Sequence, residues 1–249
     1  MVFRYKQTPL ANIPNLTLKI NQTAIEKVSE FNFLGITIED TLSWNSHISK
    51  ISNKISKIIG LLSRTKRYLD SSVLLKIYNS LILSHLHYGI LCWGFDCHKL
   101  FKIQKKAIRL ICKSKYNAHT DPLFKSLKLL KVNDIFKLQC IKFFQKYSQN
   151  NLPKYFLNIF QSEDETETIS TRAATYRRPL HTNRSTTKKT IRHEIPRIIF
   201  ALPHALKTKL RTHSLDTVKT LGKSLLLGEY PINCTKDNCY ICGRLLDNM

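Results

Sequence analysis

The chain has 249 residues, of which 43% are hydrophobic, and its 40 Lys and Arg against 17 Asp and Glu give a formal net charge of +23 at pH 7. This composition excludes an intrinsically disordered chain and allows one sizeable core or two smaller ones. So large a positive excess repels itself unless an anionic partner neutralises it, and the common partners are nucleic acid and anionic membranes.

A membrane partner is not expected. The most apolar window, Leu81–Trp93, is short and contains polar residues, whereas a spanning helix needs about 20 apolar residues. We expect no signal peptide, and the seven scattered cysteines are typical of reduced thiols in an intracellular protein. We therefore predict a protein of the nucleus or cytoplasm that binds nucleic acid, with no membrane partner and no small-molecule substrate.

The first predicted elements are short β-strands. Residues 16–20 and 24–28 flank the polar pair Asn21-Gln22, a pattern that predicts a β-hairpin. Phe31–Ile38 is predicted as a third strand, and Gly35 in its middle indicates a bulge or a close approach of another group to the backbone. The first predicted unit, residues 1–42, is therefore a short antiparallel β meander.

From Ser43 onward the apolar spacing becomes helical. Ser43 is predicted to cap a first amphipathic helix, and Asp70 with Ser71 to cap a second helix that is apolar on most sides and therefore central. The helices are predicted from Ser43 to about residue 68, and over residues 72–94, 100–112, 118–127 and 132–150. We therefore predict a helical bundle over residues 43–160.

The composition changes after residue 160. Residues 162–168 are acidic and contain no apolar residue, which predicts an exposed linker, and a basic stretch follows. We assign residues 161–190 to an acidic and then basic linker, and residues 191–249 to a loosely folded basic C-terminal region with a short helix over residues 215–227. The predicted fold class is α+β with helices dominant.

Candidate catalytic residues are scarce. Paired carboxylates can hold the Mg²⁺ ions of a polymerase or nuclease, but neighbours such as Glu39 and Asp40 point to opposite faces of a strand and would not chelate together. His85 and His87 are two residues apart in a predicted helix and do not face each other. The HExxH, GxSxG and GxxxxGK motifs do not occur. We predict no catalytic residue in this chain.

The C-terminal tail contains Cys234, Cys239 and Cys242. The second and third of these resemble half of a zinc knuckle, but zinc takes four ligands and the sequence offers no fourth one nearby. Free thiols are the favoured interpretation, and a zinc site is the alternative.

The strongest candidate site is a pair of basic helix faces. The first and third predicted helices carry Lys and Arg at spacings of three and four, and residues 48–68 and 100–120 contain no Asp or Glu. A solvated face usually mixes both signs, so we predict contact with a phosphate backbone without reading of bases. The predicted contact residues are Lys50, Lys54, Lys57, Arg64, Lys66, Arg67, Lys102, Lys105, Lys106 and Arg109.

Residues 30–62, EFNFLGITIEDTLSWNSHISKISNKISKIIGLL, resemble the segment just after the catalytic palm in reverse transcriptases of non-long-terminal-repeat retrotransposons, the jockey-like LINE elements. Glu39 stands where the family has Asp. Residues 76–94 and 100–112 also resemble the family, and the resemblance covers about residues 1–206. The residues that match the family pattern F-x-FLG-I-x-I-D-x-x-L-x-W-x-x-H-I are Phe31, Phe33, Leu34, Gly35, Ile36, Ile38, Leu42, Trp44, His47 and Ile48.

This resemblance implies a part of an RNA-directed DNA polymerase. Residues 1–42 would be the end of the palm and the primer grip, with Phe33, Leu34 and Gly35 at the primer terminus, and residues 43–160 would be a thumb along a template–primer duplex. The family's Mg²⁺-binding Asp residues would lie upstream of residue 1, so the chain alone is expected to bind no Mg²⁺ and to be inactive.

The alternative is a non-enzymatic basic remnant of a retrotransposon that binds nucleic acid or a protein. In either case the N-terminal sheet would lack its palm neighbours. We therefore expect an exposed apolar edge and poor solubility.

Overall fold

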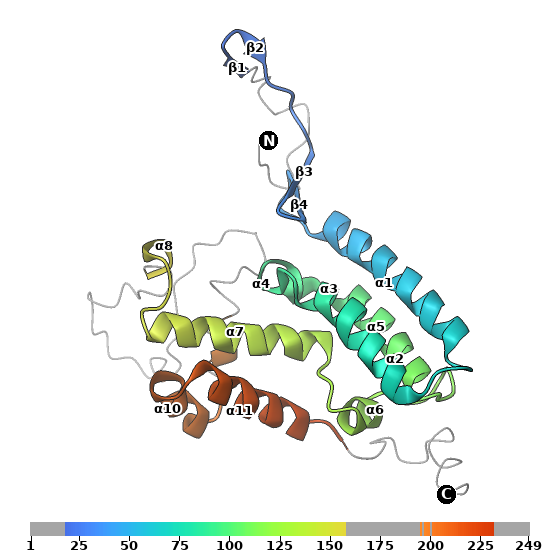
Figure 1. The fold of residues 1–249 in the computed structure, drawn as a ribbon. Helices are drawn as coiled ribbons and strands as arrows, with labels where there is room; N and C mark the ends of the chain where they lie inside the picture. The colour runs from blue at the N-terminus through green and yellow to red at the C-terminus, as the bar shows by residue number, and fades with distance from the viewer. Residues whose placement is uncertain (1–17, 158–194, 196, 200, 232–249) are drawn as a thin grey trace, which may run out of the picture.

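The computed structural model describes residues 18–157, 195, 197–199 and 201–231 (Figure 1). In these residues the strands form two separate antiparallel hairpins, in which β1 pairs with β2 and β3 with β4. The predicted three-stranded meander is therefore wrong. The strands are β1 Lys19–Ile20, β2 Thr23–Ala24, β3 Glu30–Phe33 and β4 Ile36–Glu39.

The segment predicted as one strand, Phe31–Ile38, is itself a hairpin. Leu34 and Gly35 have φ angles of 49° and 77°, and the chain reverses there so that Phe33 pairs with Ile36. Two-residue turns of this kind need positive φ at both central positions, which glycine adopts without strain. Gly35 therefore belongs to a turn and not to a bulge inside a strand.

The rest of the described chain is mostly helical, as predicted. Here η2 is a π-helical segment and η3 a 3₁₀-helical one. The helices are α1 Asn45–Thr65, α2 Ser71–Ile77, η2 Tyr78–Ile82, α3 Leu83–His87, α4 Ile90–Trp93, η3 Gly94–Asp96, α5 His98–Ile111, α6 Asp121–Ser126, α7 Val132–Ser148, α8 Lys154–Leu157, α10 His204–Thr212 and α11 Leu215–Gly228.

The predicted continuous helix over residues 72–94 is broken. It contains the π-helical turn η2, and it is interrupted at Tyr88, which is extended, and at Gly89, whose φ is 61°. A Cβ atom on Gly89 would lie 2.6 Å from the Cδ1 atom of Ile36 in β4. Both the left-handed backbone and the contact with the hairpin therefore favour glycine at this position.

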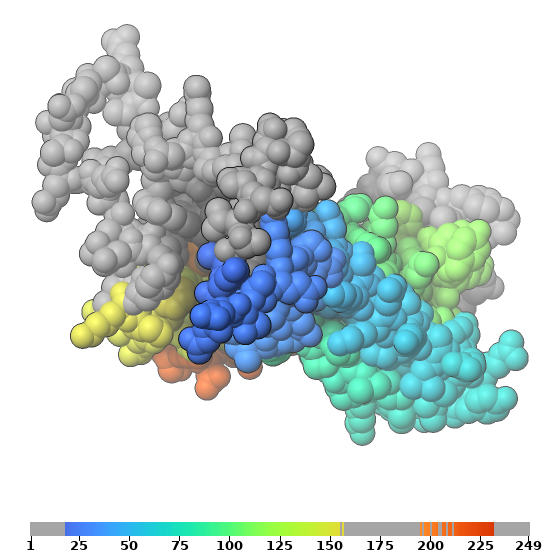
Figure 2. Space-filling view, turned by 90° about the horizontal axis from the view of Figure 1, so that it is seen from above, coloured from blue at the N-terminus to red at the C-terminus, as the bar shows by residue number. Residues whose placement is uncertain are grey.

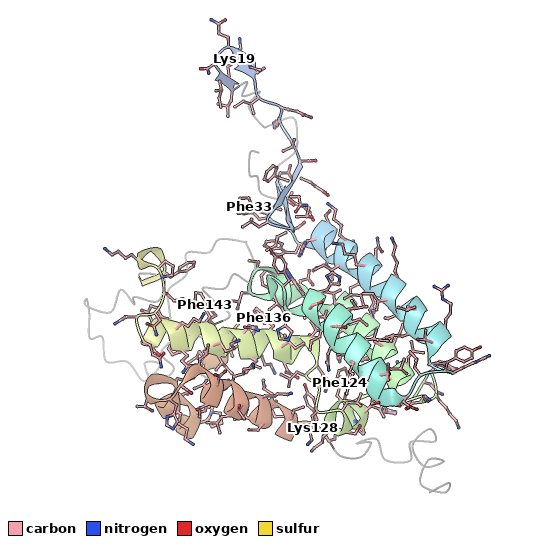
Figure 3. All side chains as sticks on the ribbon, in the orientation of Figure 1. Lys19, Phe33, Phe124, Lys128, Phe136 and Phe143 are labelled. Atoms are coloured by element: carbon pink, nitrogen blue, oxygen red, sulfur yellow. The ribbon has the colours of Figure 1, made fainter. Side chains whose placement is uncertain are left out.

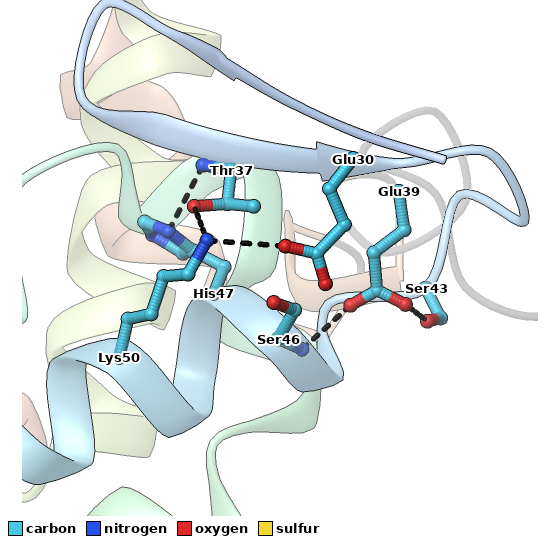
Figure 4. Close-up of polar contacts among 7 residues, drawn as sticks. All are labelled: Glu30, Thr37, Glu39, Ser43, Ser46, His47 and Lys50. Carbon is cyan, nitrogen blue, oxygen red and sulfur yellow. Dashed lines mark hydrogen bonds and ion pairs between the residues drawn. The ribbon is translucent and has the colours of Figure 1, made fainter. Parts of the chain in front are cut away.

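Neither of the two predicted side-chain caps forms. Trp44 is the N-cap of α1, and the backbone N–H of Ser46 instead donates to the carboxylate of Glu39 at 2.5 Å (Figure 4). The hydroxyl of Ser43 donates to the same carboxylate. Asp70 is the N-cap of α2, but its side chain accepts no capping hydrogen bond. Glu39 is thus a carboxylate at a helix N-terminus, a favourable place for a negative charge.

The helices α1, α2–α4 and α5 run down, up and down beside one another (Figure 1). The helices α1 and α5 are parallel, because Lys99 near the start of α5 donates to the hydroxyl of Ser49 at 3.2 Å while Ser71, just after α1, donates to the carbonyl of Ile111 at the end of α5. None of the helices in the described part of the chain has the length and apolar character needed to cross a membrane.

The long helix α7 is buried on two sides. It contacts α4 and α5 on one side and α10 and α11 on the other. Leu210, Val218 and Leu226 of the C-terminal helices are buried in the same apolar cluster as Ile135 and Ile141 of α7. The prediction of a loosely folded region over residues 191–249 is therefore wrong for the part of it that the structure describes.

Tyr230 ties the end of α11 to the start of α7. Its hydroxyl donates to Asp134 at 2.5 Å and accepts from the backbone N–H of Lys131 at 2.9 Å, while Lys125 donates to its carbonyl at 2.6 Å. Burial and the adjacent Asp134 raise the pKa of Tyr230, so the hydroxyl stays protonated as a donor. These bonds set α7 and α11 antiparallel.

Candidate nucleic-acid interface

The helix α1 separates its apolar and basic residues cleanly. Ile48, Ile51, Ile55 and Leu62 are buried, as predicted. The helix has 21 residues and is about 30 Å long at 1.5 Å per residue, and nitrogen-tipped side chains project from its outer face (Figure 3). The predicted contact residues that are exposed on α1 or just after it are Lys50, Lys54, Lys57, Arg64 and Arg67, whereas Lys66 is half-buried.

Lys50 has a different environment from the other basic residues of α1. Its ammonium donates to Glu30 at 3.1 Å and to the hydroxyl of Thr37 at 3.2 Å (Figure 4). Hydrogen bonds from Ser46 and Lys50 lower the pKa of Glu30, which therefore stays charged beside the lysine. Lys50 thus binds the β3–β4 hairpin in this structure.

The basic residues of α5 also divide into two groups. Lys102 and Lys106 are exposed. In contrast, the ammonium of Lys105 lies 4.3 Å from the centre of the Phe101 ring, and Nε of Arg109 donates to the carbonyl of Ala118 at 2.8 Å. Of these four residues, Lys102 and Lys106 thus face solvent and form no hydrogen bond or ring contact within the described residues.

Lys99, which the sequence patterns did not single out, joins the two basic rows. It contacts Ser49 of α1, and residues three and seven positions further along a helix lie on the same face. Lys99, Lys102 and Lys106 therefore form a row on the side of α5 that adjoins α1. Because the two helices are parallel and in contact, the rows make one basic surface, which we call the α1–α5 surface.

The β3–β4 hairpin lies beside the N-terminal end of α1 (Figure 2), and Phe33 is near its tip (Figure 3). Phe33 is 56% exposed and Leu34 is 73% exposed. A Cβ atom on Gly35 would lie 3.6 Å from Cε1 of Tyr88, which is an ordinary van der Waals distance. The approaching group within the described chain is therefore Tyr88, and the positive φ of Gly35, not crowding, explains the glycine.

Two side chains that the sequence patterns did not assign to the site hold this hairpin on the helices. Tyr88 donates its hydroxyl to the carbonyl of Leu34 at 2.5 Å, and Nδ1 of His47 accepts the backbone N–H of Thr37 at 3.2 Å (Figure 4). Burial, followed by the charges of Lys50 and Lys54, lowers the pKa of His47, which keeps Nδ1 free to accept. Tyr88 and His47 are thus positioning residues for the hairpin tip.

Large apolar side chains are exposed along both hairpins and the turn that follows. This confirms the predicted exposed apolar edge, whereas poor solubility remains a prediction. The exposed residues are Leu18, Ile20, Ile25, Phe31, Phe33, Leu34 and Leu42.

The described residues contain no group of three or more His, Cys, Asp or Glu side chains that could hold a metal ion. The carboxylate of Glu39 is bonded to α1, as described above. Cys234, Cys239 and Cys242, the candidate zinc ligands, lie outside the described residues. The cysteines that the structure describes, none of which forms a disulfide within the described residues, are Cys92, Cys97, Cys112 and Cys140.

Comparison with known proteins gives two curated relatives. The chain is 27% identical over 134 residues to "RNA-directed DNA polymerase from mobile element jockey" of Drosophila funebris, which covers 50% of this chain and 14% of the relative. It is 28% identical over 141 residues to the protein of the same name from Drosophila melanogaster, covering 53% of this chain and 15% of the relative. The match thus spans a small part of the length of these relatives.

No family model matches the chain, and no solved structure does. The two curated relatives nevertheless bear out the resemblance that the motifs indicated. The chain contains a segment related to the RNA-directed DNA polymerase of jockey-like mobile elements.

Proposed function

We propose that the α1–α5 surface binds a template–primer duplex through its phosphate backbone, as part of the RNA-directed DNA polymerase of a mobile element. The single observation that carries this proposal is the parallel pair of basic rows with no acidic residue on either exposed face. Lys54, Lys57 and Arg64 on α1 form no hydrogen bond or ion pair with an acidic group among the described residues, and Lys102 and Lys106 lie beside them.

The dimensions of the surface fit a duplex. A helix of about 30 Å matches roughly nine base pairs of B-form DNA, in which each base step rises about 3.4 Å, and somewhat more base pairs of the more compact RNA–DNA hybrid. Lysine and arginine heads on long stems contact phosphate oxygens without reading base edges, so binding is expected to be independent of sequence. The exposed hairpin tip, with Phe33 and Leu34, would then face one end of the bound duplex, where the resemblance places the primer terminus.

A salt titration tests this proposal directly. We expect the intact chain to bind a fluorescein-labelled RNA–DNA hybrid with a steep loss of affinity on adding salt. Five to six phosphate contacts correspond to a log–log slope of about −5, and about a thousandfold loss between 50 and 200 mM salt. Fluorescence anisotropy at several KCl concentrations measures that slope.

Removing positive charges from the α1–α5 surface provides a second test of the proposal. The variant Lys54→Gln/Lys57→Gln/Arg64→Gln should flatten the slope by about 3, because every phosphate that is no longer neutralised lowers its magnitude by about 0.9. The control Lys76→Gln/Lys115→Gln removes two exposed lysines elsewhere and should leave the slope close to that of the wild type. Equal slopes for the two variants, or wild-type binding that does not respond to salt, would contradict the proposal.

A further inference from the structure

A second group of basic side chains lies where α3, α7 and α11 meet. Lys142 and Lys146 come from α7, Lys219 comes from α11, and His87 is the last residue of α3. None of these residues belongs to the α1–α5 surface, and they are far apart in the sequence. The fold alone brings them together.

The helix packing fixes this arrangement. A Cβ atom on Gly222 of α11 would lie 2.9 Å from Cδ1 of Leu138 in α7, so the two helices approach closely there. They are antiparallel, because the bonds of Tyr230 join the end of α11 to the start of α7. The first turns of α11, which carry Lys219, therefore lie beside the second half of α7, which carries Lys142.

His87 joins the group through Gln139. The amide Nε2 of Gln139 lies 3.1 Å from Nδ1 of His87, and Lys142 follows Gln139 by three residues, on the same face of α7. With the Gln139 amide donating to Nδ1, the proton of the neutral imidazole is on Nε2. That N–H is a hydrogen-bond donor for an anion.

Asp216 on α11 is the acidic group that acts on Lys142, and it offsets the positive charges of this group only in part. Lys142 is half-buried, Lys146 and Lys219 are exposed, and none of the three forms a hydrogen bond or ion pair within the described residues. Burial, followed by Lys219 and Lys146, lowers the pKa of Lys142, and Asp216 counteracts this only in part. Burial, followed by Lys142 and Lys219, lowers the pKa of His87 in the same way. A bound anion would relieve both effects.

We propose that Lys142, Lys219 and His87, with Lys146 at the edge, form a second phosphate site, which holds the phosphodiester backbone of a single nucleic-acid strand. Two ammonium groups and one imidazole N–H supply donors from three helices to a tetrahedral anion. The group offers point charges and no arrangement that reads bases, so the contact is independent of sequence. The site is separate from the α1–α5 surface, so it stands whether or not that surface binds a duplex.

The test uses the full chain and a fluorescein-labelled single-stranded RNA of 20 nucleotides. We expect Lys142→Gln/Lys219→Gln to flatten the log–log salt slope by about 1.4, since each phosphate that a lysine neutralises on a single strand accounts for about 0.7. The control Lys76→Gln/Lys115→Gln should leave the slope unchanged. Because Lys142 is half-buried, Lys146→Gln/Lys219→Gln provides a variant with both changes at exposed positions, and it should flatten the slope in the same direction.

Three results separate this site from its alternatives. A salt slope that neither lysine pair changes, with melting temperatures like that of the wild type, overturns the proposal. Isothermal titration with inorganic phosphate provides the second result. If the wild type binds phosphate, Lys142→Gln/Lys219→Gln does not, and the RNA salt slope is unchanged, the site belongs to a free phosphate ligand and the proposal of a nucleic-acid contact is overturned. The third result supports both surfaces independently: Lys54→Gln/Lys57→Gln/Arg64→Gln loses only hybrid binding, and Lys142→Gln/Lys219→Gln loses only binding of the single-stranded RNA.

Discussion

The β3–β4 hairpin exposes large apolar side chains, whereas the helical body, which comprises the helices from α1 to α11, buries most of its own. In the body, Leu74, Tyr78 and Trp93 are completely buried, whereas Phe33 and Leu34 at the hairpin tip are mostly exposed. Burial of large side chains contributes about 1.5–3 kcal/mol each, so the body is held by its core. An isolated two-stranded hairpin is only marginally stable in water, and this one depends on its turn and on a few bonds to the helices.

The backbone N–H of Ser46 in α1 supplies one of these bonds by donating to Glu39, and three side chains outside the hairpin supply others. Tyr88 holds the carbonyl of Leu34, His47 holds the N–H of Thr37, and Lys50 binds Glu30. Each such bond contributes about 0.5–1.5 kcal/mol net. Because few bonds hold the hairpin on the helices, we expect its position to change more readily than the fold of the body.

The largest expected effect is in the core of the body. Trp93→Ala should lower the free energy of unfolding by about 3–5 kcal/mol, because it empties a fully buried site and removes the indole N–H that donates to the carbonyl of Tyr88 at 3.0 Å. Phe33→Ala should change it by less than about 0.5 kcal/mol. Urea denaturation followed by circular dichroism measures both. Similar losses for the two variants would remove the distinction between hairpin and body.

The two glycines with positive φ should respond differently to alanine. Gly35→Ala should cost about 1 kcal/mol from the left-handed backbone alone, since its Cβ atom has room beside Tyr88. Gly89→Ala should cost about 2 kcal/mol, because its Cβ atom also meets Ile36 at 2.6 Å. The measurement is thermal unfolding of both variants.

Gly60→Ala is the matched control for this pair. Gly60 is in the interior of α1 with no atom within 4 Å of a Cβ atom, so alanine should stabilise the protein by about 0.5–1 kcal/mol. A smaller cost at Gly89 than at Gly35 would show that the hairpin does not press on the helices at Ile36.

Removing one hydroxyl should loosen the hairpin without unfolding the body. Tyr88→Phe deletes the donor to the Leu34 carbonyl, which we expect to weaken docking by about 1 kcal/mol, or about fivefold in the local opening equilibrium. Hydrogen exchange should become faster at residues 30–39 and stay unchanged in α5 and α7. Tyr116→Phe, at an exposed loop position, is the control. Unchanged exchange in the hairpin would show that the bond carries none of the docking.

The smallest expected effect is a dependence of stability on pH. The folded-state pKa of His47 is lowered mainly by burial, so the unfolded state binds a proton more readily. The stabilising contribution is therefore complete above the unfolded pKa of about 6.5 and is lost as pH falls from there toward the folded pKa. Melting temperatures between pH 7.5 and 5 should decline, and by less in His47→Asn.

His87 has a lowered pKa too and contributes in the same direction. The double variant His47→Asn/His87→Gln should therefore show a weaker decline than either single variant. A melting temperature that rises on acidification would reverse the sign assigned to both imidazoles.

Helical periodicity carried most of the fold prediction. The apolar spacing of Ile48, Ile51 and Ile55 determined which side of α1 is buried, and the absence of acids beside Lys54 and Lys57 identified the candidate surface. These properties depend on residues three or four positions apart, which local geometry brings together whatever the rest of the fold does.

Pairings between distant residues were not predictable in this way. No local pattern indicates that Glu39 accepts from the first turn of α1, that Gly89 breaks a helix beside Ile36, or that Leu210 and Val218 cover α7. The turn at Leu34-Gly35 was missed because a hairpin and a single strand with a central glycine share the same alternation.

Residues close together along the chain were enough to predict the helical body, the basic face of α1 and the relation to jockey-like polymerases. The packing of distant elements, in contrast, determines which cations form intramolecular contacts and which face solvent. It bonded Lys50 to Glu30 and Arg109 to Ala118, and it gathered Lys142, Lys219 and His87 from three helices. Charge interactions act through space, so their strength follows from the packing of distant elements.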